Sequence, residues 1–210
     1  MSLESLMWSF AIVFMLHELE EIIMLKPWLA RNAAVLTRRF PTVGPRIVRR
    51  YGPLSTSAIA LAILEQFVIL SLVILASVVL RAPGLWAGVL TGYLVHIVGH
   101  LGQAAIFRGY CPFLFTSLLS LPYGAYSLAR LYGEGLLSPI EHLAWTAAAI
   151  PLIAVNLLFA MRLASLFEAW LRRNMTWTAA DQACARGRPH FRAPHIGGGG
   201  HSIARHPSEL

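Results

Sequence analysis

The sequence predicts an all-α protein, a polytopic membrane bundle of about five transmembrane helices. Of its 210 residues, 57% are hydrophobic and only 13% are charged, whereas soluble domains carry about 25% charged residues. The mean hydropathy is +0.61. The apolar residues gather in runs long enough to cross a hydrocarbon core of about 30 Å, which takes roughly 20 helical residues. A chain this short cannot bury so much apolar surface in one aqueous core.

The expected spans occupy residues 6–28, 55–80, 85–107, 112–132 and 139–162. The first span resembles a signal peptide, but its apolar run is too long and no small-x-small cleavage site follows it. In the third span, Gly88, Gly92 and Gly99 predict close helix packing. The spans and their connections form one domain over residues 1–173. Residues 174–210 contain a four-glycine run and three prolines, and we expect a disordered cytoplasmic tail there.

Lysine and arginine residues gather at one end of the expected spans. All but two of the 17 lie at the end of the first, third or fifth span or after it, and the exceptions are Arg81 and Arg130. Because positive charge marks the cytoplasmic side, the N-terminus is expected outside and the C-terminus in the cytoplasm, as in a bacterial inner membrane. The pattern accounts for the sequence pI near 10.1 without a nucleic-acid partner. Cys111 and Cys184 fall on the cytoplasmic side, where a disulfide is not expected.

The first span carries charged residues near its middle, where a lipid-facing helix has none. They are His17, Glu18, Glu20 and Glu21. At 100° per residue, Glu20 lies about −60° and Glu21 about +40° from His17, so the three share one arc of roughly 100°. Three glutamates at a helix centre cost roughly 7–10 kcal/mol, more than the about 3–6 kcal/mol that the large apolar residues of the span contribute. Partners inside the bundle must compensate them. Glu18 is either an outer partner or exposed.

Other spans supply candidate partners at the same depth. Glu65 lies in the second span, and His96 and His100 lie four residues apart on one face of the third. Counting about 1.5 Å per residue from the cytoplasmic ends, all the candidates lie roughly 10–18 Å deep. The candidate set is His17, Glu20, Glu21, Glu65, His96 and His100. Imidazole and carboxylate groups bind Zn, Fe or Mn, and helical bundles build such sites from facing helices.

The sequence therefore predicts an intramembrane site for two divalent metal ions, Fe or Zn, with Mn also suited. Glu20 or Glu21 is the candidate general base. We expect Gln103, Asn156 and Tyr123 around the ligands or the substrate. Thr116 and Ser120 are candidates for the lining of a substrate pocket, although helix packing explains them nearly as well. A polar network or proton relay without metal stays open, and the tail histidines His190, His195, His201 and His206 indicate either a solvated tail or metal capture.

The run His17-Glu18-Leu19-Glu20-Glu21 matches the motif after which the HXXEE family of integral membrane proteins is named. Glu65 and the His96-x-x-x-His100 pair also resemble the recurring polar positions of that family. The resemblance covers roughly residues 7–160. It implies a compact helical membrane domain with a catalytic role, and it implies no substrate.

We expect a metal-dependent membrane enzyme that acts on a lipophilic or amphipathic small molecule. A two-iron site would activate O₂ for hydroxylation or desaturation and would need a redox partner, whereas a zinc site would activate water for hydrolysis. The carboxylate-rich ligand set slightly favours the oxidative chemistry. The alternative function is a metal or proton transporter. The five spans, without an inverted repeat or a second polar layer toward the outer face, argue against it.

Overall fold

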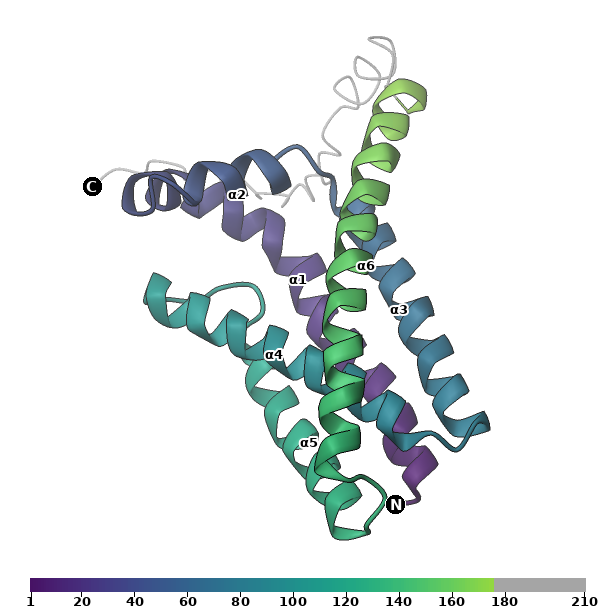
Figure 1. Cartoon of the computed structure of the whole chain (residues 1–210). Coiled ribbons are helices and arrows are strands. Elements are labelled where there is room, and N and C mark those ends of the chain that lie inside the picture. Colours follow the sequence, from purple (N-terminus) through teal and green to yellow (C-terminus); the bar gives the residue numbers. More distant parts are fainter. Residues whose placement is uncertain (176–210) are drawn as a thin grey trace, which may run out of the picture.

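The computed structural model describes residues 1–175, and it confirms the predicted all-α fold. Six helices make up this part of the chain: α1 (Leu3–Arg39), α2 (Gly44–Tyr51), α3 (Thr56–Val79), α4 (Pro83–Phe107), α5 (Leu114–Gly133) and α6 (Pro139–Asn174) (Figure 1). Of these, α3, α4 and α6 are long and apolar enough to cross a membrane. Glutamates interrupt the apolar run of α1, and serines, tyrosines and an arginine interrupt that of α5. The expected tail, with its histidines and Cys184, lies outside the described residues apart from its first two positions.

The long helices alternate in direction along the bundle. Figure 1 shows the N-terminus and the α3–α4 and α5–α6 connections at one end of the molecule. The C-terminal ends of α1 and α6 lie at the other end, together with α2. Arg81 and Arg130 belong to the first end, whereas the arginines of α2 and of the end of α6 belong to the second. The bundle therefore separates the basic residues into the two groups that the sequence defines.

Three features differ from the expected spans. The first helix continues past residue 28 to Arg39 with Pro27 inside it, α6 runs beyond residue 162 to Asn174, and α2 was not expected. The extensions are stable because their polar side chains find acceptors at neighbouring helix ends. Lys26 Nζ donates to the carbonyl of Gly52 at 2.7 Å, and the Arg39 guanidinium donates to the last carbonyls of α4 at 2.6 and 3.0 Å.

The turn between α1 and α2 depends on a glycine. Gly44 is buried, and its N–H donates to the Phe40 carbonyl at 2.7 Å. A Cβ at this position would clash with the backbone of Leu36 in the last turns of α1. Only glycine allows α2 to fold back so closely on α1.

Small residues bring α4 and α6 together. A Cβ added to Gly88 would lie 2.6 Å from the carbonyl oxygen of Trp145, and one added to Gly92 would clash with Ile153. The prediction of close packing is confirmed at these two positions. It is wrong at Gly99, where a Cβ would meet no atom within 4 Å. Of these three glycines, Gly88 and Gly92 in the first part of α4 therefore lie in close contact with α6, and Gly99 does not.

An aromatic core holds the first half of α1 against α4. Phe10 is buried, and its ring centroid lies 5.2 Å from that of Tyr93 and 6.2 Å from that of Trp86. Phe14, one turn later, lies 6.0 Å from Tyr93. These contacts set the register between the two helices. The next turn of α1 along this face brings His17 to α4.

Candidate metal centre

Four of the six predicted ligands meet between α1 and α4. Each offers one nitrogen or carboxylate oxygen, and these four atoms all lie within 4.8 Å of one another. We call this group the His/Glu cluster; it consists of His17, Glu21, His96 and His100. Both helices contribute residues spaced four apart, which face the same side. The role of these residues as metal ligands stays a prediction.

Two histidines and a carboxylate converge on one point. His100 Nε2 lies 2.7 Å from His96 Nε2 and 3.1 Å from Glu21 Oε1. Phe113 stacks on the His100 ring with centroids 3.9 Å apart and limits its rotation. A neutral imidazole carries one N–H, so a single proton between these three atoms leaves two of them offering lone pairs. These three atoms therefore offer more lone pairs than there are protons to bind them.

The fourth member, His17, is completely buried. Its Nδ1 lies 3.1 Å from Thr116 Oγ1, while its Nε2 has no hydrogen-bond partner among residues 1–175. The Thr116 hydroxyl donates its proton to Glu20 Oε2 at 2.6 Å. Its oxygen is then left to accept from Nδ1–H, which makes Nε2 the unprotonated nitrogen. Glu20 thus determines, through Thr116, which nitrogen of His17 offers a lone pair.

Glu20 itself points away from the cluster, toward the start of α5. Its Oε2 accepts from the backbone N–H of Thr116 at 2.9 Å as well as from the hydroxyl, and its Oε1 accepts from the Tyr110 hydroxyl at 2.9 Å. The first turn of a helix presents unpaired N–H groups and favours a carboxylate. Glu20 is therefore bound by three donors and linked to the cluster only through Thr116.

The α4–α5 connection, which lies between two expected spans, carries two titratable groups, Tyr110 and Cys111. Burial, reinforced by the hydrogen bond to Glu20, raises the pKa of Tyr110 to about 12, so its hydroxyl remains a donor at neutral pH. Burial raises the pKa of the free Cys111 thiol to about 11. The Cys111 thiol is therefore neutral at neutral pH, and Cys111 is not a member of the cluster. Trp28 Nε1 donates to the Tyr110 carbonyl at 2.6 Å and fixes this connection to α1.

Glu65 lies apart from the cluster. Its oxygens are buried without a hydrogen-bond partner in the described part of the chain, and the Asn156 side chain of α6 lies near it. Tyr123 donates to the Leu6 carbonyl at 2.7 Å within the aromatic core, and Gln103 is exposed on α4. None of these residues belongs to the cluster. Glu65 was placed with the cluster because its depth along the bundle matches, but depth does not determine which neighbouring helix a side chain faces.

Two residues near the cluster were missed or left open by sequence reasoning. Thr116 was expected only as a possible lining residue, and its place between Glu20 and His17 depends on where α5 begins. Glu18, whose position was left open, is buried with 6% of its surface exposed. Glu18 precedes Glu21 by three residues on α1, so a buried carboxyl lies within one helical turn of the cluster.

The sequence model of a family described as proteins of unknown function with an HXXEE motif matches residues 8–127. That region is more than half of the chain. The chain belongs to the HXXEE family. No match was found among curated proteins or solved structures. The region shared with the HXXEE family contains the whole His/Glu cluster together with Glu20 and Thr116. Within the motif, the histidine and the last glutamate enter the cluster, and the first of the two adjacent glutamates holds α5.

Proposed function

We propose that this HXXEE protein is a membrane-embedded metalloenzyme that holds one divalent metal ion in the His/Glu cluster and acts on a lipophilic or amphipathic substrate. The observation that carries the proposal is the convergence of three imidazoles and one carboxylate within 4.8 Å. Ligand atoms around one tetrahedral metal ion lie about 3.3 Å apart, given metal–ligand distances of about 2.0–2.1 Å. The 2.7 and 3.1 Å separations around His100 are close to that spacing.

The residues fit a cation on chemical grounds as well. A buried polar atom without a partner costs free energy, and the buried His17 Nε2 has none among residues 1–175. A cation at the cluster would accept this lone pair and those left over at His96, His100 and Glu21. It would also compensate the buried negative charge that the glutamates bring into an apolar bundle. Thr116, which accepts from His17 Nδ1, would act as the outer partner that orients a ligating imidazole.

One metal ion and a histidine-rich ligand set favour water activation over two-iron oxidation. A divalent metal supplies Lewis acidity and lowers the pKa of water. The oxidative alternative needs bridging carboxylates, but Glu20 is engaged by three donors and Glu65 lies apart. We therefore assign Glu20 a positioning role, and we place hydrolysis ahead of oxygen chemistry.

Access to the cluster favours a substrate that arrives from the side of α4. His96 is exposed although its Nε2 contacts His100. Gly99 and Gln103 lie along the same side of the helix and are also exposed, with open space around Gly99. In a membrane this side would face lipid. Two cavities in the described chain, of about 510 and 320 Å³, lie elsewhere and are lined by no member of the cluster.

The placement in a membrane is part of the proposal. Three helices apolar enough to cross a bilayer and the separation of basic residues between the two ends of the bundle support it. The end that carries α2 and most of the arginines would face the cytoplasm, as the positive-inside rule requires.

Metal analysis of the detergent-purified full-length protein tests the proposal. We expect one divalent ion per chain by elemental analysis, zinc for the hydrolytic reading, and its loss when His96 and His100 are both replaced by alanine. Two irons per chain would instead support the oxidative alternative. A well-folded protein that binds no metal after incubation with Zn²⁺, Fe²⁺ or Mn²⁺ would overturn the proposal.

A further inference from the structure

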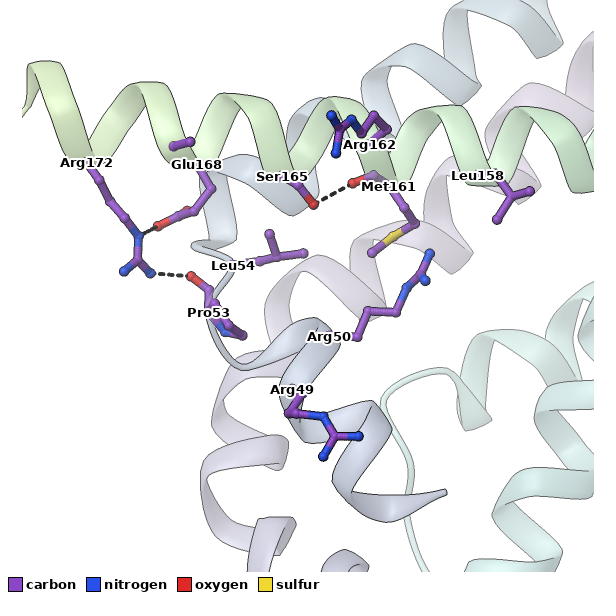
Figure 2. A pocket seen from close by; sticks show the side chains of 11 residues that line it. Arg49, Arg50, Pro53, Leu54, Leu158, Met161, Arg162, Ser165, Glu168 and Arg172 are labelled. Atoms are coloured by element: carbon purple, nitrogen blue, oxygen red, sulfur yellow. Dashed lines mark hydrogen bonds and ion pairs between the residues drawn. The ribbon is translucent and has the colours of Figure 1, made fainter. Parts of the chain in front are cut away.

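A cavity of about 510 Å³ lies away from the His/Glu cluster, at the arginine-rich end of the bundle. It opens between the end of α2, the α2–α3 connection and the C-terminal half of α6 (Figure 2). Four arginines line it, together with a single acidic residue, Glu168. They are Arg49, Arg50, Arg162 and Arg172. The cavity therefore concentrates positive charge in one place.

One of these arginines is already neutralised. Arg172 donates to Glu168 Oε1 at 2.8 Å and to the Pro53 carbonyl at 2.6 Å (Figure 2). The other oxygen of Glu168 accepts from the Ser55 backbone N–H at 2.7 Å, which ties α6 to the start of α3. Glu168 is thus fully engaged in holding the wall of the cavity together.

The remaining three arginines have no carboxylate partner among residues 1–175. Arg49 and Arg50 come from the last turn of α2, and Arg162 comes from α6. All three are exposed. These three guanidinium groups line one cavity from two helices, and guanidinium groups pair most strongly with phosphate or carboxylate oxygens.

The rest of the wall is apolar apart from Ser165, whose hydroxyl donates to the Met161 carbonyl at 2.9 Å. Leu54 is buried, and Met161 and Leu158 follow along α6. Val155, three residues before Leu158 and about 60° around the helix from it, is also an exposed aliphatic side chain. A ligand that fits both parts carries an anionic group at one end and an apolar chain at the other.

We propose that this cavity binds a phosphate-bearing headgroup, with the attached acyl chain lying along α6. Basic pockets between membrane helices at the cytoplasmic side take such headgroups, because that leaflet carries the anionic lipids. The proposal concerns a site separate from the His/Glu cluster and needs no metal there. A soluble phosphoester would offer the same phosphate without the chain.

The test compares two double variants of the full-length protein. Arg50→Gln with Arg162→Gln removes two charges from the cavity. Arg38→Gln with Arg46→Gln removes two exposed charges from α1 and α2 that do not line it. Binding of phosphatidylglycerol and of phosphatidylcholine would be measured by native mass spectrometry from mixed-lipid nanodiscs, alongside the metal content of each variant. Inorganic phosphate would be added in a parallel arm.

We expect the wild type to retain phosphatidylglycerol over phosphatidylcholine. The cavity variant should lose at least about tenfold in that preference, and the control variant less than about threefold. Inorganic phosphate that displaces the lipid or raises the melting temperature only when the cavity arginines are present would support a soluble source of the phosphate. Equal losses in both variants, or no preference in the wild type, would overturn the proposal.

A second variant and a second measurement complete the test. If the glutamine variant is unstable, Arg50→Lys with Arg162→Lys keeps the charge and should retain most of the lipid preference. The metal content should be unchanged in all of these variants. Failure of the cavity proposal is thereby distinguished from failure of the proposed metal site.

Discussion

Glu20 and Glu21 are neighbours in the motif, yet their surroundings are opposite. Glu20 faces the start of α5, where three N–H and O–H groups donate to it. Glu21 faces the imidazoles of α4, where its Oε1 lies 3.1 Å from His100 Nε2. The groups around it offer few N–H or O–H donors. The first environment satisfies a carboxylate completely with protein donors. The second leaves lone pairs that a cation would satisfy.

Two identical side chains on one helix turn therefore have different roles in the structure. Glu20 fixes the position of α5 and, through Thr116, the orientation and tautomer of His17. Glu21 is available for a ligand. The two environments meet at a single residue, His17, which bonds to Thr116 through Nδ1 and is also a member of the cluster.

Removing the imidazoles of α4 that face Glu21 should have the largest effect on metal affinity. With His96 and His100 both replaced by alanine, metal affinity should fall by more than about 100-fold, because changes in outer partners alone cost about 10–100-fold. Elemental analysis and Zn²⁺ titration would measure it. His142→Ala is the matched control, since His142 bonds to Thr91 and Tyr132 outside the cluster. Equal metal content in both proteins would contradict a metal role for the cluster.

The two glutamates can be compared directly as glutamine variants. Glu21→Gln should weaken metal binding by more than about 100-fold, whereas Glu20→Gln should weaken it by about 10–100-fold, as expected for an outer partner. Glu20→Gln should in addition lower the melting temperature, because its amide would face N–H and O–H donors at the start of α5. A larger metal effect at Glu20 than at Glu21 would reverse the assignment of the two roles.

Thr116 tests whether the two environments communicate. Thr116→Val keeps the shape of the side chain but removes the hydroxyl, so His17 loses its Nδ1 partner and metal affinity should fall about tenfold. Thr116→Ser restores the hydroxyl and should recover most of that loss. If Thr116→Val binds metal as tightly as Thr116→Ser and the wild type, the hydroxyl does not orient His17.

Tyr110→Phe should have the smallest effect. It removes one of three donors to Glu20, which lowers the free energy of unfolding by about 1 kcal/mol and changes metal affinity less than about threefold. The pKa of Tyr110 is raised to about 12, so its phenol stays protonated longer in the folded than in the unfolded protein. The stability difference between wild type and variant should therefore be constant below about pH 10, the ordinary pKa of tyrosine, and shrink above it. Unfolding measured from pH 7 to pH 11 would show a growing difference if Tyr110 were instead ionised in the fold.

Much of the fold could be predicted because apolar runs define helices that face lipid or a core. The ends of α3, α4 and α5 lie within two residues of the expected spans. Helix α2 and residues 29–39 of α1 were not predicted, since their stability comes from contacts such as the Arg39 donation to the end of α4. Hydropathy carries no information about such contacts.

The candidate site could be predicted only in part. Helix periodicity pairs His17 with Glu21 and His96 with His100, and the structure brings these pairs together. Counting residues along a span gives the depth of a side chain but not its direction relative to other helices. That is why Glu65, at a matching depth, lies near Asn156 and outside the cluster. The role of Thr116 depends on the placement of α5, which no local pattern encodes.

The hydrogen bond between Thr116 and Glu20 also has a consequence for the history of the family. Two positions 96 residues apart in the chain share one proton, so a mutation at either changes what the other can tolerate. Homologues that lack an acidic residue at the position of Glu20 should also lack a hydroxyl at the position of Thr116. The two positions should be inherited as a pair, and that pairing would be visible in an alignment before any protein is purified.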